Sequence, residues 1–89
     1  MQRRVYHFSG HVQGVGFRFT TQNIAQQHNV LGYVRNLPDG RVELVMEGDE
    51  NEMEDVVKNV NRRMACYVNR IETQTVPATG EFQRFYIRH

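Results

Sequence analysis

The sequence has little of several features that mark other classes of protein. Its 89 residues contain one cysteine, two prolines and no tryptophan. With Cys66 alone, no intramolecular disulfide can form, so we expect a reducing, cytoplasmic location and a buried, inert thiol. No stretch approaches the ~18 apolar residues of a membrane span, and no apolar segment follows the basic residues 1–4 as a secretory signal requires. These absences favour one small domain, residues 1–89, with no membrane partner.

Charge is also nearly balanced. The chain has 11 Lys and Arg against 10 Asp and Glu, and its pI of about 8.0 is below the value above ~9 that is typical of nucleic-acid-binding domains. The four histidines (His7, His11, His28 and His89) are scattered along the sequence. We therefore predict no nucleic-acid partner, no metal and no cofactor.

Hydrophobic periodicity predicts five strands and two helices. The expected strands are residues 4–12, 31–35, 42–47 and 68–76, and a short one marked by Phe82, Phe85 and Ile87. The expected helices are residues 19–28 and a segment around 53–64, which Asp49 or Asn51 can cap. This β-α-β-β-α-β order with a late extra strand predicts a ferredoxin-like α+β sandwich, in which two helices lie on one face of an antiparallel sheet.

Apolar stripes along these elements predict the core. The expected core residues are Tyr6 and Phe8 on the first strand, Thr21, Ile24, Ala25 and His28 on the first helix, Val42, Leu44 and Met46 on the third strand, and Met53, Val56, Val57, Val60 and Met64 on the second helix. Glu43 and Glu47 alternate with the third strand's apolar residues, so this strand is expected to be half-buried.

The glycine-rich segment GHVQGVGFR, residues 10–18, lies between the first strand and the first helix. Gly14 and Gly16 can adopt positive φ, which lets successive backbone N–H groups turn toward one point. A helix that starts after Arg18 directs its free N–H groups to the same place, and the guanidinium offers a planar fork of donors. The segment is therefore predicted to bind a phosphate-like anion.

A second block, GYVRNLPDGRVE at residues 32–43, contains a strong hairpin signal in its Pro-Asp-Gly turn. Together the two blocks resemble the acylphosphatase family, and the length and element order match over essentially the whole chain. The resemblance implies hydrolysis of a small-molecule acyl phosphate, a carboxyl–phosphate anhydride, to a carboxylate and inorganic phosphate. By motif position, Arg18 would bind the phosphoryl group and Asn36 would orient the attacking water. The phosphate cradle would be formed by the backbone amides of Gln13, Gly14, Val15, Gly16, Phe17 and Arg18.

This chemistry explains what the motifs lack. A carboxylate leaving group with a pKa of about 4 needs no general acid, and phosphoryl transfer is catalysed mainly by positioning and by charge stabilisation. Inorganic phosphate is then the product and an inhibitor, and we expect a monomer. The chain departs from the family pattern at residues 62–67, where many members have a Gly-Pro-like turn. Tyr33 stands where tryptophan is frequent.

The competing interpretations are an RNA-binding domain, a P-loop NTPase and a catalytically silent domain. Residues 14–19 resemble the Gly-Phe-Gly-Phe core of an RNA-recognition motif, but that motif belongs on the third strand, which here carries two glutamates and no aromatic residue. No P-loop sequence occurs. A catalytically silent regulatory or ligand-binding domain on the same fold stays open, and only the intact pair of Arg18 and Asn36 argues against it. Arg35 and Arg41 are interpreted as solvated charges and His11 as an exposed strand residue.

Overall fold

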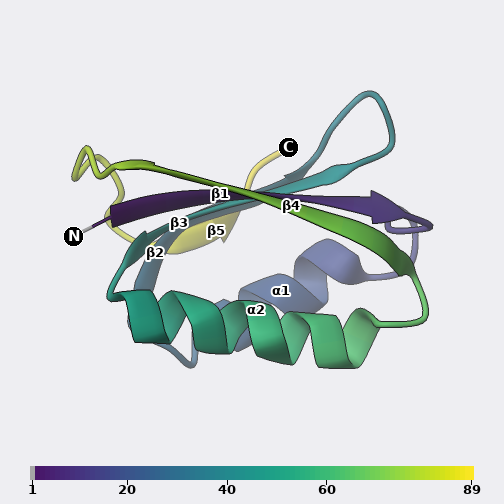
Figure 1. Cartoon of the computed structure of the whole chain (residues 1–89), viewed down its shortest axis with the longest axis horizontal. Helices are drawn as coiled ribbons and strands as arrows, with labels where there is room; N and C mark the ends of the chain where they lie inside the picture. Colours follow the sequence, from purple (N-terminus) through teal and green to yellow (C-terminus); the bar gives the residue numbers. More distant parts are fainter. Residues whose placement is uncertain (1) are drawn as a thin grey trace.

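The computed structural model describes residues 2–89. Its elements are β1 (Gln2–Gly10), α1 (Phe17–Ala25), β2 (Val30–Asn36), β3 (Val42–Gly48), α2 (Glu50–Met64), β4 (Val68–Pro77) and β5 (Phe85–Ile87). Both helices cover the same face of the sheet and the opposite face is open (Figure 1). The predicted α+β sandwich is confirmed. No helix in this part of the chain is long and apolar enough to cross a membrane.

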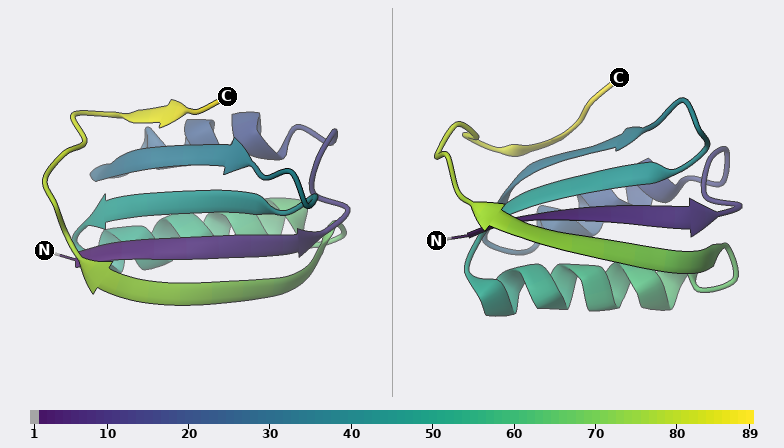
Figure 2. Two further views of the ribbon diagram at one scale, coloured as in Figure 1. Left: turned by 90° about the horizontal axis from the view of Figure 1, so that it is seen from above. Right: turned by 45° about the horizontal axis from the view of Figure 1, so that its top comes forward.

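The sheet is mixed rather than purely antiparallel. Its strand order is β4-β1-β3-β2-β5, and the first four strands pair antiparallel, as predicted. β5 instead pairs with β2 in parallel. The chain leaves β4 at one edge, crosses the end of the sheet and enters the other edge in the direction of β2 (Figure 2). The prediction of an antiparallel sheet was therefore wrong for the last strand.

The core lies between the helices and the sheet. The alternating residues of β1 and β3 and the stripe of α2 are buried as predicted, with Val57 only partly buried. The buried hydrophobic residues are Tyr6, Phe8, Val12, Phe17, Ile24, Ala25, Val30, Val34, Val42, Leu44, Val45, Met46, Met53, Val56, Val60, Met64 and Phe85. For the larger of these side chains, such as Phe, Leu and Met, transfer from water to the core contributes about 1.5–3 kcal/mol each. This packing holds the loop before α1 at the end of β1.

Helix α1 begins earlier than predicted. Phe17, its first residue, is only 2% exposed and its ring lies 4.9 Å from that of Phe8. The burial of Phe17 draws the helix start two residues toward the N-terminus, which places Arg18 in the first turn rather than before it. The helix ends at Ala25, so His28 lies in the following turn and is only half-buried.

The turn after α2, where the sequence departs from the family pattern, packs against the end of β1. Tyr67 donates its backbone N–H to the Met64 carbonyl (2.9 Å) and accepts the His11 N–H at its own carbonyl (2.9 Å). Cys66 is exposed, so the prediction of a buried thiol was wrong. Cys66 lies in the turn between α2 and β4. Met64, before the turn, is buried in the core, and Val68, after the turn, packs against the core.

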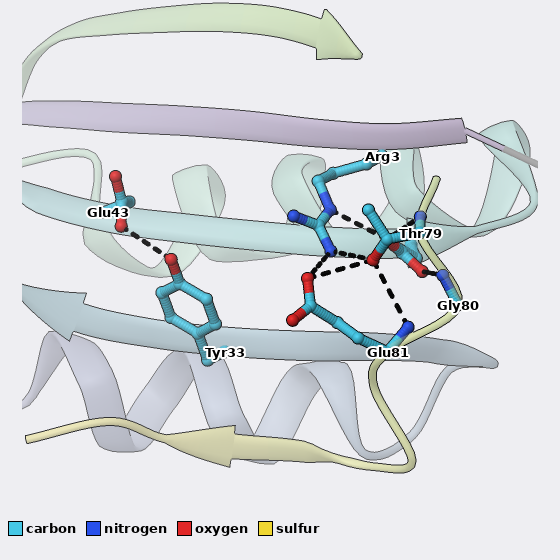
Figure 3. Close-up of polar contacts among 7 residues, drawn as sticks. Arg3, Tyr33, Glu43, Thr79, Gly80 and Glu81 are labelled. Carbon is cyan, nitrogen blue, oxygen red and sulfur yellow. Dashed lines mark hydrogen bonds and ion pairs between the residues drawn. The ribbon is translucent and has the colours of Figure 1, made fainter. Parts of the chain in front are cut away.

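The open face of the sheet contains a buried carboxylate that the alternation of β3 did not reveal. Glu47 is 1% exposed and accepts hydrogen bonds from Arg3 Nε (2.8 Å), Thr79 N (2.9 Å) and Gly80 N (3.1 Å) (Figure 3). Arg3 also pairs with Glu81. Burial alone would raise the pKa of Glu47, but the two backbone N–H groups and the guanidinium hold that pKa below its usual value. We call Arg3, Glu47, Thr79, Gly80 and Glu81 the Glu47 cluster.

A second group of contacts on this face surrounds Glu43. Its carboxylate accepts the Tyr33 hydroxyl (3.0 Å) and Arg35 Nε (2.8 Å) and lies 2.9 Å from His7 Nε2. Burial opposes ionisation of Glu43, but the hydrogen bonds from these partners lower its pKa overall. The pKa of Tyr33 is raised by burial and by its hydrogen bond to Glu43. Arg35 is therefore ion-paired with Glu43, so the prediction that it is a solvated charge was incomplete.

Candidate active site

The loop between β1 and α1 has the conformation that its glycines predict. Gly14 and Gly16 both have φ of 79°, in the left-handed region. A Cβ atom at either position would meet no other atom within 4 Å, so the backbone conformation, rather than a shortage of space, favours glycine there. Gly16 is the N-cap of α1, and its carbonyl accepts the N–H of Thr20 (3.0 Å). The N–H groups before Thr20 at this helix start lack intrahelical partners and can bind an anion.

The loop's apolar side chains pack against the core. Phe17 is buried and Val15 packs against the core cluster. These two residues can therefore serve an anion only through the backbone, as the resemblance implies. Their side chains anchor the loop to the fold.

Gln13 connects the loop to the β2–β3 turn. Its side-chain Nε2 donates to the carbonyl of Leu37 (2.8 Å) and to that of Arg41 (3.0 Å). Leu37 N in turn donates to the Arg41 carbonyl (2.8 Å), which closes the turn. The segment that follows Asn36 is thereby attached to the loop between β1 and α1, which we call the glycine loop. The side chain of Gln13 has a structural role that the sequence did not suggest.

Arg18 opens onto a hollow of about 180 Å³. The hollow is lined by Val12, Gly14, Gly16, Phe17, Arg18, Phe19, Ile87 and His89. Of the residues predicted to bind phosphate or to catalyse, Gln13, Val15 and Asn36 do not line it. Within residues 2–89, the guanidinium has no carboxylate partner, and its Nη1 lies 3.5 Å from His89 Nδ1. Arg18 therefore carries a charge that no acidic group of the described chain neutralises.

Asn36 is the last residue of β2 and pairs with Val42 of β3. Its side-chain amide makes no hydrogen bond to any other part of the described chain, so the amide is free for a ligand. In the parallel pairing of β2 with β5, Val34 lies opposite Ile87, and the Arg88 N–H donates to the Val34 carbonyl (2.9 Å). Two residues further along both segments, this register leads to Asn36 and His89. The C-terminal segment that follows β5 thus runs along β2 as far as Val34 and brings His89 beside Arg18.

Comparison with known proteins identifies the family of this chain. The sequence model of the acylphosphatase family matches residues 4–87. The chain belongs to the acylphosphatase family. Proteins of this name are hydrolases that act on acyl phosphates.

Relatives and solved structures cover nearly the whole chain. An acylphosphatase of Lactobacillus johnsonii is 42% identical over 81 residues, which are 89% of this chain and 89% of that protein. The crystal structure of acylphosphatase from Bacillus subtilis has a TM-score of 0.90 and 32% identity over 100% of both chains. The HypF structure from T. kodakarensis is similar over 100% of this chain but 12% of its own length, with a TM-score of 0.85 and 34% identity.

His89 is the residue near the acylphosphatase loop that sequence reasoning missed. The predicted last strand had no assigned partner, so nothing placed its end beside α1. The signal that could have found His89 is the parallel pairing of β5 with β2, which carries the C-terminal residues toward Arg18. His11 is exposed, as predicted, but it follows β1 instead of lying in that strand.

The other arginine near the turn is already paired. Arg41 Nε contacts the Asp39 carboxylate at 2.8 Å, so the prediction that Arg41 is a solvated charge was incomplete. The Arg41 backbone N–H also donates to Asp39 (3.0 Å), and this bond, followed by the guanidinium, lowers the pKa of Asp39. Arg18 is thus distinguished from Arg35 and Arg41 by its lack of a carboxylate partner.

A small polar cluster lies at the opposite end of α1 from Arg18. Ligand atoms of His28, Glu52 and Asp55 lie within 4.8 Å of one another, so the histidines are less isolated than the sequence indicated. Glu52 accepts the Asn29 N–H (2.8 Å) and lies 3.5 Å from His28 Nδ1. These contacts join the turn after α1 to α2 and play no part at the glycine loop.

Proposed function

We propose that this acylphosphatase holds the phosphoryl group of a small acyl phosphate in loop 13–18 and that Asn36 orients the water that attacks it. The observation that carries the proposal is the guanidinium of Arg18, which has no carboxylate partner in the described chain and lies beside a glycine loop that leads into a helix N-terminus. A phosphoryl dianion there receives a two-pronged contact from Arg18 and further hydrogen bonds from the backbone N–H groups.

The reaction then needs few other groups. The acyl carboxylate leaves without a proton, and the loose transition state of phosphoryl transfer is stabilised by donors that are already in position. A neutral amide at Asn36 can accept a hydrogen bond from water without repelling the dianion, as a carboxylate would. The proton that water loses can pass to the phosphate itself.

The remaining parts of the proposal concern the protein's setting. We propose a cytoplasmic monomer that uses no metal and no cofactor, and that has no nucleic-acid or membrane partner. One chain supplies Arg18, the glycine loop and Asn36, so the proposed mechanism needs no second copy. The exposed thiol of Cys66 is compatible with a reducing compartment.

The test is a time course of benzoyl phosphate hydrolysis by the purified protein in the presence of EDTA. We expect turnover to persist and inorganic phosphate to inhibit competitively. Loss of activity on chelation would refute the metal-free mechanism.

A second measurement separates the two residues. Asn36→Ala should lower kcat while the inhibition constant of phosphate is kept, whereas Arg18→Ala should raise that constant and also slow the reaction. Equal loss of phosphate binding in both variants would contradict the proposed division of roles. If the wild type hydrolyses no acyl phosphate but binds phosphate, the silent ligand-binding domain is the better interpretation.

A further inference from the structure

Phe19 is a large apolar side chain that the fold does not use. Apart from Tyr67, it is the only large hydrophobic residue exposed in the described chain, and it is 64% exposed. It follows Arg18 in the first turn of α1, two positions after the buried Phe17. Because successive helical residues are turned by about 100°, Phe19 projects away from the core while Phe17 enters it. No requirement of the packing explains a phenyl ring at this position.

The ring of Phe19 borders the same hollow as Arg18. The other sides of the hollow that face solvent are formed by Ile87, which is half-buried, and by His89. Val12 and Phe17 form its buried floor. An apolar wall thus lies directly beside the donors that are proposed to hold the phosphoryl group.

The size of the hollow decides where an acyl group can go. A cavity of about 150 Å³ accommodates one benzene molecule. The hollow of about 180 Å³ beside Arg18 therefore cannot enclose both a phosphoryl group and a complete aromatic ring. With the phosphoryl group at the glycine loop, a bulky acyl group must extend over the rim, which is where Phe19 and His89 lie.

We propose that Phe19, with the ring of His89, forms an acyl subsite that favours aromatic and other bulky apolar acyl phosphates over acetyl phosphate. This inference rests on the proposed function, since it takes the phosphoryl group to be bound at loop 13–18. Phe19 acts as a specificity residue through contact with the non-reacting part of the substrate. The interaction of one aromatic ring with another supplies a discrimination of about three- to tenfold.

The experiment compares kcat/KM for benzoyl phosphate and for acetyl phosphate in the wild type and in Phe19→Ala. The benzoyl-to-acetyl ratio should fall by about three- to tenfold in the variant. Phe19→Leu, which keeps an apolar surface but has no ring, should give an intermediate ratio. Tyr67→Ala removes the other exposed aromatic side chain, which does not line the hollow, and should leave the ratio unchanged.

Binding of non-hydrolysable analogues separates this inference from the proposed function. The ratio of dissociation constants for phenylphosphonate and methylphosphonate should shift in Phe19→Ala in the same direction as the kinetic ratio. If the wild type hydrolyses neither substrate, the proposed function fails, and the analogue ratio still tests the subsite. An unchanged ratio in Phe19→Ala, or an equal loss with both substrates, overturns the subsite and leaves Phe19 as a surface residue or a support of the loop.

Discussion

The glycine loop and the Glu47 cluster use charge in opposite ways. In the Glu47 cluster, a buried carboxylate is saturated by one guanidinium and two backbone N–H groups. At the glycine loop, the Arg18 guanidinium has no acidic partner in the described chain and opens onto a hollow. Donors with partners inside the protein stabilise the fold, whereas donors without such partners remain available to a ligand. The difference supports the proposal that the glycine loop is a binding site, whereas the Glu47 cluster is a structural connection.

The Glu47 cluster also has an indirect connection to the site. It fixes residues 79–81, which lie in the segment that crosses from β4 to β5. β5 then leads to His89 beside Arg18. The two regions are thus connected along the chain. Mutation of the glycine loop should reduce activity, whereas mutation of the Glu47 cluster should reduce stability.

The largest expected effect is on activity at Arg18. Arg18→Lys should lower kcat/KM by about 10²–10³, because a point charge cannot reproduce the two-pronged contact with a phosphoryl group. The free energy of unfolding should change by less than about 0.5 kcal/mol, since no ion pair is broken. Steady-state kinetics and urea unfolding of the same preparation measure the two quantities. Substantial destabilisation with activity retained would reverse the contrast between the regions.

Glu47 should show the opposite pattern. Glu47→Ala leaves two backbone N–H groups without their acceptor and removes one of the two carboxylate partners of Arg3, so it should lower the free energy of unfolding by about 2–3 kcal/mol. The fraction that remains folded should keep its kcat. Glu81→Ala is the matched control, because this exposed carboxylate pairs with the same arginine and its loss should give no resolvable change in stability. If both variants destabilise equally, the burial of Glu47 is not the source of its effect.

Substitution of Gln13 should reduce both stability and activity. Gln13→Ala removes two hydrogen bonds between the glycine loop and the turn after Asn36, which should lower stability by about 1–2 kcal/mol. Displacement of the loop relative to Asn36 should also reduce kcat by about tenfold. Gln26→Ala, at an exposed position just beyond α1, serves as the control for both measurements. A loss of stability without any loss of kcat would show that the Gln13 side chain does not position the site.

The pH dependence of stability gives the smallest effect. The pKa values of Glu47 and Glu43 are lowered from the ordinary value of 4.5 in the folded state, so below that pH the unfolded chain binds more protons than the folded one. Their contribution to stability is present above this pH and is lost as the pH falls through the folded values. Glu47→Gln should therefore flatten the acid limb of a plot of unfolding free energy against pH. If the acid limb of Glu47→Gln is as steep as that of the wild type, other carboxylates are responsible for acid unfolding.

The sequence pattern predicted the structure of those segments whose conformation depends on their own residues. The apolar stripe of α2 and the alternation of β3 predicted their buried faces because helical and strand periods are properties of the backbone. The glycines of residues 10–18 predicted a loop of positive φ before a helix. Arg18 was recognised because a guanidinium beside such a loop has a specific chemical use. The roles of Arg18 and Asn36 stay predictions until the variants are measured.

What the sequence failed to predict depends on contacts between distant segments. Helix α1 starts earlier than predicted because Phe17 packs against Phe8. Cys66 is exposed because it lies in the turn between α2 and β4, outside the buried stripe of α2 that ends at Met64. The burial of Glu47 depends on backbone N–H groups at residues 79 and 80, more than thirty positions away. None of these partners can be inferred from a local window.

By itself, the sequence determined most of the elements, the loop of positive φ before α1 and the resemblance to acylphosphatases, because each depends on residues that are close together in the chain. Only the tertiary structure decided that β5 runs parallel beside β2 and brings His89 to Arg18. It alone placed Phe19 beside the hollow. It also showed that Arg18 has no carboxylate partner in the described chain, whereas Arg35 and Arg41 each have one. The physical reason is that the pairing of a charge and the walls of a pocket are set by neighbours in space.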